Sequence, residues 1–247
     1  MSNYILYEFL TKYEMDPIYV PFNGKNYYER DPALDQCILL ASKDIKTNPK
    51  CLILIQGAGH VKLGLWSNSV TINEGINLGS MIPFVELAKK YGYSILIMNP
   101  NERFGLYGKN KNIFFSMKEH CSYVYKNLVY NNGNIKKVYF ISHSLGSECN
   151  VEILKEFEED LLKGRFRKIA FTDGCHGGAF LDLSKAGIEI FTKISRNFVA
   201  SIEEKGKFLK DLSEYYGCEI YSSGTNQHEY TTGVAIDIIF EFLNGDK

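Results

Sequence analysis

Several features that define common protein classes are absent from this chain of 247 residues. No apolar stretch approaches the roughly 18 residues needed to cross a bilayer, because Asp237 and Glu241 interrupt even the apolar C-terminal segment. The N-terminal residues MSNYILYEFLTKYE lack the basic start and the sustained apolar run of a secretory signal, and no Asn-x-Ser/Thr sequence occurs. A membrane-spanning role is excluded, and we expect an intracellular protein of the nucleus or cytoplasm.

The six cysteines lack the spacing of a metal site, since no Cys-x-x-Cys pair occurs among them. We expect reduced, mostly buried thiols and no bound metal. The chain also lacks an excess of either charge, with 28 basic and 29 acidic side chains. The densest basic run is Lys163, Arg165, Arg167 and Lys168, which is typical of a solvated helix end. We therefore expect no direct nucleic-acid contact, and any link to RNA would run through a protein.

Short β-branched and aromatic runs alternate with helical patterns along most of the chain. The predicted strands are residues 51–56, 93–99, 137–142, 168–172 and 218–222. The predicted helices are residues 81–91, 114–130, 148–162, 183–212 (one helix or two) and 230–243. This order predicts an α/β fold with a mostly parallel sheet covered by helices on both faces.

The first fifty residues give a less clear pattern. Pro17 and Pro21 mark turns, residues 27–30 could form an edge strand, and residues 31–45 a helix. No linker, repeat or low-complexity tract follows them. We expect residues 1–247 to form a single domain that includes this N-terminal part.

The turn Ser142-His143-Ser144-Leu145-Gly146 lies between a predicted strand and a predicted helix. It resembles the Gly-x-Ser-x-Gly turn of α/β hydrolases, with serine in place of the first glycine, and it puts Ser144 at the nucleophile position. A plain strand–loop–helix connection would also accept small residues here. The presence of a base and an acid elsewhere in the sequence would favour the nucleophile over the plain connection.

A base and an acid occur in the order that α/β hydrolases require. His228 follows the last predicted strand, and Asp173 ends the strand at residues 168–172, although in many hydrolases the acid comes one strand later. His176 is a rival base in the glycine-rich loop after Asp173. His143 is expected to point away from Ser144, and both His143 and His176 are candidate pocket residues.

The oxyanion donors are predicted to be the N–H of Leu145 and that of Ala58 or Gly59. The turn that contains Ala58 and Gly59 follows the first strong strand, as the corresponding loop of esterases does. Its Gly-x-Gly sequence could also indicate a dinucleotide loop, but position 62 is lysine and no Gly-Lys-Ser/Thr sequence occurs. We discard the nucleotide interpretation and expect no organic cofactor.

The segment NPNERFG at residues 99–105 follows the next strand and would lie at the rim of the same pocket. Either Asn101 or Glu102 contacts a substrate or partner there, or the segment is a simple turn.

Four blocks in this chain resemble one family. They are residues 54–102, ISHSLG at residues 141–146, FTDGCHG at residues 171–177 and SSGTNQHEYTT at residues 222–232. They are similar to the Arb-type domain, found in argonaute-binding and cotranscriptional-regulator proteins with an α/β-hydrolase-like fold. The resemblance implies a three-layer sandwich with Ser144, Asp173 and His228 in corresponding blocks. It also implies regulatory roles in RNA silencing, heterochromatin or splicing, with an argonaute-type or chromatin protein as partner.

Two functions follow as hypotheses. The first is a serine hydrolase that cleaves an acyl ester or thioester through Ser144, Asp173 and His228. The alternative is a catalytically silent domain that binds a silencing or chromatin protein.

Overall fold

The computed structural model describes residues 2–22, 27–31, 34–102, 114 and 116–245. Its center is an eight-stranded sheet in the order β1-β2-β4-β3-β5-β6-β7-β8. The strands are β1 (Met15–Val20), β2 (Cys37–Ser42), β3 (Lys50–Ile55), β4 (Ser94–Ile97), β5 (Lys137–His143), β6 (Phe166–Thr172), β7 (Ser195–Val199) and β8 (Glu219–Ser222). Strands β3 to β8 run parallel, whereas β2 pairs antiparallel with both β1 and β4.

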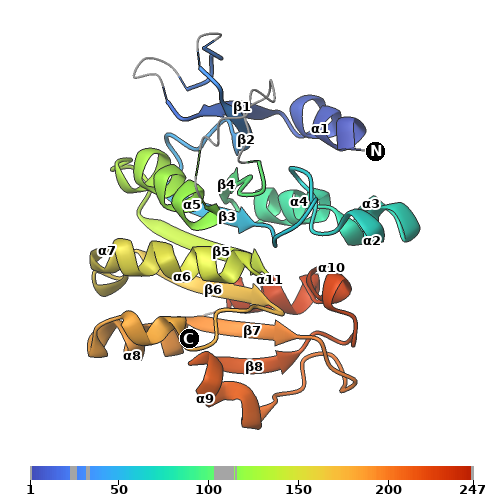
Figure 1. Ribbon diagram of the computed structural model, residues 1–247, viewed down its shortest axis with the longest axis vertical. Coiled ribbons are helices and arrows are strands. Elements are labelled where there is room, and N and C mark those ends of the chain that lie inside the picture. Colours follow the sequence, from blue (N-terminus) through green and yellow to red (C-terminus); the bar gives the residue numbers. More distant parts are fainter. Residues whose placement is uncertain (1, 23–26, 32–33, 103–113, 115, 246–247) are drawn as a thin grey trace.

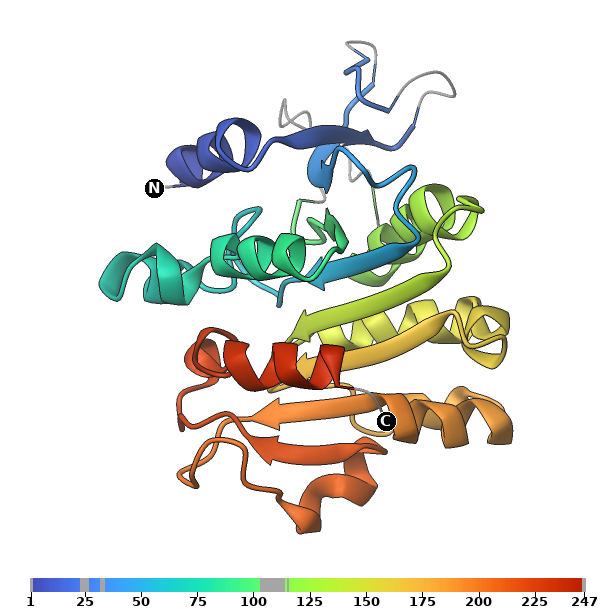
Figure 2. The same ribbon diagram turned by 180° about the vertical axis from the view of Figure 1, so that it is seen from behind.

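Helices cover both faces of this sheet and make it the middle of three layers (Figures 1 and 2). One face carries α5 (Met117–Tyr125), α6 (Gly146–Glu156), α7 (Glu158–Leu162) and α8 (Lys185–Ile194); the other carries α1 (Ser2–Thr11), α4 (Ile82–Lys90) and α11 (Ile236–Asn244). Shorter helices are α2 (Asn68–Asn73), α3 (Ile76–Gly79), α9 (Ser213–Tyr216) and α10 (Thr231–Val234). The predicted α/β class is confirmed.

The apolar runs that suggested strands become the core because both sheet faces are buried. Phe140 on β5 and Phe171 on β6 are fully buried on the face of α5 to α8, and Phe84 of α4 and Phe240 of α11 pack on the other face. Among the described residues, no helix is long and apolar enough to cross a membrane.

The prediction for residues 27–45 was wrong in its elements. Residues 27–30 form a turn, and the edge strand is β1 instead. The region assigned to a helix, apart from residues 32 and 33, which lie outside the described residues, contains strand β2. Tertiary pairing explains this outcome, because the continuous apolar run of β2 lies between β1 and β4.

The helix predicted over residues 183–212 was also wrong. Helix α8 ends at Ile194, and strand β7 begins at Ser195. The short run at residues 195–199 fits between β6 and β8, where Asn197 and Phe198 are both buried. Strand β7 therefore separates the strand that carries Asp173 from the strand that precedes His228.

Parallel pairing brings the functional loops to one edge of the sheet. Ile55 of β3 pairs with Ser142 of β5, and His143 pairs with Thr172 of β6. The loops after these strands therefore start side by side. This edge holds the residues that were predicted to form the site.

Candidate active site

Ser144 lies on a sharp turn between β5 and α6, with a left-handed φ of 51°. This conformation is unfavourable for a residue with a side chain by about 1–2 kcal/mol. The turn is forced by close packing below it. A Cβ atom on Gly146 would lie 2.6 Å from the Gln56 carbonyl oxygen and 2.8 Å from that of Ile55. Glycine at this position lets α6 start directly against β3.

Serine at position 142, where the hydrolase pattern has glycine, fits without disturbing the turn. Ser142 is buried on β5 between Ile55 of β3 and Phe171 of β6. Its hydroxyl has no hydrogen-bond partner among the described residues. The departure from the pattern leaves the conformation at Ser144 intact.

His228 links the two other predicted triad residues. Its Nδ1 lies 2.6 Å from Oδ2 of Asp173, and its Nε2 lies 3.0 Å from Oγ of Ser144. An ionised carboxylate only accepts hydrogen bonds, so Nδ1–H donates to Asp173 and Nε2 can accept the hydroxyl hydrogen of Ser144. The structure thus brings the three residues together, and their catalytic roles stay predictions.

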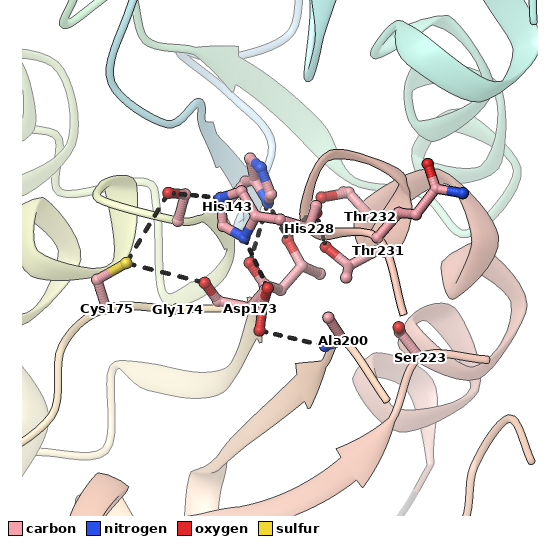
Figure 3. A network of polar contacts seen from close by, with 12 residues as sticks. His143, Asp173, Gly174, Cys175, Ala200, Ser223, His228, Thr231 and Thr232 are labelled. Atoms are coloured by element: carbon pink, nitrogen blue, oxygen red, sulfur yellow. Dashed lines mark hydrogen bonds and ion pairs between the residues drawn. The ribbon is translucent and has the colours of Figure 1, made fainter. Parts of the chain in front are cut away.

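Asp173 reaches His228 from the end of β6, although it precedes the strand that many hydrolases use. Its backbone is also left-handed, with φ of 45°. Its second oxygen, Oδ1, accepts a hydrogen bond of 3.1 Å from the N–H of Ala200, just past the end of β7 (Figure 3). The carboxylate therefore bridges the end of β7 and the loop that carries His228.

This arrangement shifts the pKa values of both partners. The hydrogen bond to Asp173 raises the pKa of His228 above its usual value, against the opposing effect of burial. Burial alone would raise the pKa of Asp173, but the hydrogen bonds from His228 and the Ala200 N–H and the charge of His228 outweigh it, and the pKa is lowered. Asp173 is thereby kept ionised and can stabilise a protonated His228.

His143 packs directly against His228. The two ring centroids are 4.8 Å apart and the planes are tilted by 35° (Figure 3). Nδ1 of His143 lies 3.0 Å from the carbonyl oxygen of Thr172, so this nitrogen donates. Burial first, and the nearby His228 second, lower the pKa of His143 to about 4. His143 is therefore a neutral neighbour that supports the His228 ring.

His176, the rival base, lies elsewhere. It is buried, its ring centroid is 4.0 Å from that of Phe171, and its Nε2 is 3.2 Å from the carbonyl oxygen of Tyr216. Burial lowers the pKa of His176 to about 4. The contact with the Ser144 hydroxyl is made by His228, so the geometry favours His228 as the base.

The loop after β3 approaches Ser144 closely. A Cβ atom on Gly57 would lie 2.9 Å from Cβ of Ser144, so only glycine fits there. Among the described residues, the N–H groups of Leu145, Ala58 and Gly59 have no hydrogen-bond acceptor. All three residues line a cavity of about 700 Å³. Free N–H groups at such a position are what an oxyanion site needs.

The cavity also brings in the other predicted pocket residues. Gly59, Asn101 and Glu102 line it, whereas His143 and His176 are outside the lining set. Asn101 Nδ2 lies 2.8 Å from the Gly57 carbonyl oxygen, so its side chain binds the loop after β3. Residues 103–105, the end of the predicted rim segment, lie outside the described residues.

Sequence reasoning missed the side chains that connect the turn at Ser144 with the loop after Asp173. Ser147 Oγ donates to the Ser144 carbonyl oxygen at 2.6 Å and accepts from the Cys175 N–H at 2.8 Å. Asn197 Oδ1 accepts from the Gly174 N–H at 3.1 Å. A serine at the second residue of a helix, and an asparagine inside an unrecognised strand, carry no distinctive sequence signal.

One free cysteine thiol, that of Cys175, lies near the site. All six cysteines are free and five are buried, while Cys175 is exposed with its Sγ 3.9 Å from Ser144 Oγ. Across the described part of the chain, no group of three or more His, Cys, Asp or Glu side chains is gathered to hold a metal ion.

Comparison with known sequences shows what this chain is similar to. The sequence model of the Arb2 domain matches residues 3–114. The chain is 27% identical over 293 residues to the cotranscriptional regulator ARB2A homolog of Xenopus tropicalis, covering 97% of this chain and 67% of that protein. It is 25% identical over 291 residues to human cotranscriptional regulator ARB2A, covering 96% of this chain and 69% of that protein. The chain spans about two thirds of the length of these relatives.

Solved structures share the fold. A histone deacetylase structure from Saccharomyces cerevisiae superimposes with a TM-score of 0.60 at 12% identity, covering 98% of this chain and 94% of that one. The histone deacetylase Clr3 structure gives 0.59 at 15% identity, covering 98% of this chain and 37% of that one. At these identities the likeness shows the fold alone. The predicted resemblance is confirmed: the Arb2 domain model matches part of this chain, and the chain is similar over nearly its whole length to proteins named cotranscriptional regulator ARB2A.

Proposed function

We propose that this protein is a serine hydrolase that cleaves acyl esters or thioesters. The observation that carries the proposal is the continuous hydrogen-bonded series from Asp173 through His228 to Ser144, with distances of 2.6 and 3.0 Å. Each atom in the series has the donor or acceptor character that acyl transfer requires. A plain connecting turn would need neither this series nor the left-handed backbone at Ser144.

The reaction follows from the geometry. Ser144 Oγ attacks the carbonyl carbon of the substrate while His228 Nε2 takes its proton, and the N–H groups of Leu145 and Ala58 stabilise the oxyanion. The intermediate collapses as protonated His228 gives the proton to the departing alcohol or thiol. Water then attacks the acyl-enzyme with His228 again as base, which releases the acid and restores Ser144.

The cavity beside Ser144 gives the substrate a place to bind. It is lined by both polar and apolar groups, including Met117, Lys118 and Glu148 next to the oxyanion donors. Lys118 and Glu148 form an ion pair of 3.0 Å across this wall. A small acyl substrate fits its volume of about 700 Å³.

A fluorophosphonate probe tests the proposal, because it reacts only with activated serine hydroxyls. We expect the wild type to be labelled, Ser144→Ala to be unlabelled, and His228→Ala to be labelled at least about 1,000-fold more slowly. Ser142→Ala is the matched control, because it removes a buried hydroxyl without a partner from the same turn. It should be labelled like the wild type.

The alternative function is a catalytically silent domain that binds a silencing or chromatin protein. The observation that favours it is the name of the relatives, which are cotranscriptional regulators. An argonaute-type partner belongs to this alternative. Folded wild type that stays unlabelled would support it and would refute the hydrolase proposal.

A further inference from the structure

The peptide bond between Gly57 and Ala58 is held from one side by a single side chain. Nδ2 of Asn101 donates to the Gly57 carbonyl oxygen at 2.8 Å and to the Val61 carbonyl oxygen at 3.4 Å. In a planar trans peptide, the carbonyl and the following N–H point in opposite directions. Whatever orients the Gly57 carbonyl therefore also orients the Ala58 N–H.

The loop itself supplies little restraint. Ala58, Gly59 and His60 are exposed, and Gly59 has a φ of 121° with open space where a Cβ atom would lie. Side-chain amides hold it instead. Gln56 donates to the Val61 carbonyl oxygen at 3.2 Å, and Asn68 donates to that of His60. Asn101 is the side chain that binds the carbonyl next to the Ala58 N–H.

Asn101 is well placed for this task because the chain segment just before it is anchored. It follows β4, whose continuation at Met98 donates a backbone hydrogen bond of 3.1 Å to Leu54 of β3. The buried Asn99 donates from its backbone to His120 Nε2 at 3.3 Å and from its side chain to the Ile38 carbonyl oxygen at 2.9 Å. The amide of Asn101 thus extends from a rigid strand end.

We infer that Asn101 is a positioning residue, which aims the Ala58 N–H at the oxyanion. This inference rests on the proposed hydrolase function. Carbonyl oxygens only accept, so the amide nitrogen must face Gly57 and Val61. With its donors engaged there, the side chain acts on the proposed catalytic site through the loop.

Two substitutions separate positioning from simple space filling. Asn101→Ala removes the amide. Asn101→Asp keeps the shape but sets a negatively charged oxygen against two carbonyl oxygens, so it cannot donate to Gly57. The matched control is Asn68→Ala, which removes an amide from the same loop at His60, away from the Gly57–Ala58 peptide.

The readout is the rate of fluorophosphonate labelling, because the phosphoryl oxygen of the probe must enter the oxyanion site. We expect Asn101→Ala and Asn101→Asp to be labelled about 10- to 100-fold more slowly, less than the loss of a whole oxyanion donor. For hydrolysis of 4-nitrophenyl acetate, kcat should fall by the same factor with KM unchanged. The midpoint of the rate–pH curve should stay at its wild-type value because His228 and Asp173 are untouched.

The outcomes distinguish this inference from the function on which it rests. If folded wild type is not labelled, the hydrolase function fails. If wild type is labelled and Asn101→Asp reacts equally fast, the hydrolase stands and the positioning role is wrong. If Asn68→Ala slowed labelling by the same factor, the positioning role of Asn101 would also be wrong, because any loosening of the loop would then have that effect.

Discussion

The two ends of strand β6 carry similar chemical groups in opposite settings. Before the strand, Arg165 and the Tyr125 hydroxyl contact Asp160 Oδ2 at 3.0 and 2.6 Å. After the strand, His228 contacts Asp173 and leads to the Ser144 hydroxyl. Each end therefore has a carboxylate, a basic group and a hydroxyl.

The two groups of residues differ in how many of their hydrogen-bonding atoms already have partners in the protein. The side chains of Arg165 and Asp160 are only 14% and 7% exposed. Arg165 donates further hydrogen bonds to four backbone carbonyl groups, those of Val129, Tyr130, Asn132 and Ile135. No donor is left for a ligand, so this set ties α7 to the segment after α5. It also corrects the expectation that the basic run 163–168 is entirely a solvated helix end.

The set after β6 is more open and more strained. The side chains of His228 and Asp173 are 45% and 24% exposed, and both Ser144 and Asp173 have left-handed backbones. Its final hydroxyl belongs to Ser144, whose neighbour Leu145 lines the cavity. The comparison teaches that saturation with backbone partners is typical of a structural ion pair, whereas an open end and local strain are what the proposed catalytic set combines.

The largest expected effect comes from Asp173→Asn. The neutral amide cannot stabilise a protonated His228, and its NH₂ group favours the wrong tautomer of the ring, so labelling should slow by about 1,000- to 10,000-fold. Asp182→Asn is the matched control, because that exposed carboxylate pairs with Lys155 far from the triad series. Equal rates in Asp173→Asn and wild type would remove the acid from the proposed mechanism.

The same variant should change the pH dependence. Labelling needs neutral His228, so in wild type it should rise with pH around a midpoint above the usual histidine pKa of about 6.5, because Asp173 raises the pKa of His228. In Asp173→Asn, the midpoint should move down. The rate–pH curve measures this shift, and an unchanged midpoint would contradict it.

The free energy of unfolding should also depend on pH through His228 and Asp173. The raised pKa of His228 stabilises the fold fully below about pH 6.5 and less as pH rises through the folded-state pKa. The lowered pKa of Asp173 stabilises it above about pH 3.9 and less as pH falls through the folded-state pKa. The stability difference between wild type and Asp173→Asn should therefore be largest between these values in urea denaturation.

Substitution of Arg165, before β6, should change stability and leave the labelling rate unchanged. Arg165→Met leaves Asp160 buried without its cation and should lower the free energy of unfolding by about 3–5 kcal/mol. The labelling rate per folded molecule should stay at the wild-type value. Lys163→Met is the control, because Lys163 pairs with Glu159 on the open surface and its removal should hardly move the denaturation midpoint. A similar shift in both variants would show that Arg165 is no more than a surface cation.

The smallest expected effect is an increase in stability. Ser144→Gly relieves the left-handed backbone and should raise the free energy of unfolding by about 0.5–1 kcal/mol relative to Ser144→Ala. Both variants lose the hydroxyl, so their difference isolates the Cβ atom. Urea denaturation measures it. If glycine gave no gain over alanine, the turn would not be strained.

Much of the fold could be predicted because long periodic segments determine it. The strands β3, β5 and β6 each contain a run of at least three apolar residues, and the helical patterns between them place those strands in parallel. Strand β7 was missed because RNFV is short, holds two polar residues and follows directly on α8. Strand β2 was missed because its pairing with β1 and β4 depends on residues distant in sequence.

The triad residues could be found because each follows a recognisable strand. The same reasoning predicted Asp173 as the acid, but it could not find how the side chain reaches His228 across strand β7. That reach depends on a left-handed residue and on the Ala200 N–H at the end of an unrecognised strand. The role of Asn101 was out of reach for a similar reason, because a hydrogen bond to Gly57, 44 positions earlier, exists only after β3 and β4 pair.

The contact of Gly146 with the Gln56 and Ile55 carbonyl oxygens has a mechanical consequence. Strand β3 pairs with β5 along its whole length, and the loops that follow the two strands lie close together at this glycine. The loops that carry Ser144 and Ala58 therefore start from neighbouring, paired strand ends. A bulkier residue at position 146 would push these loops apart and change the separation between Ser144 and the Ala58 N–H.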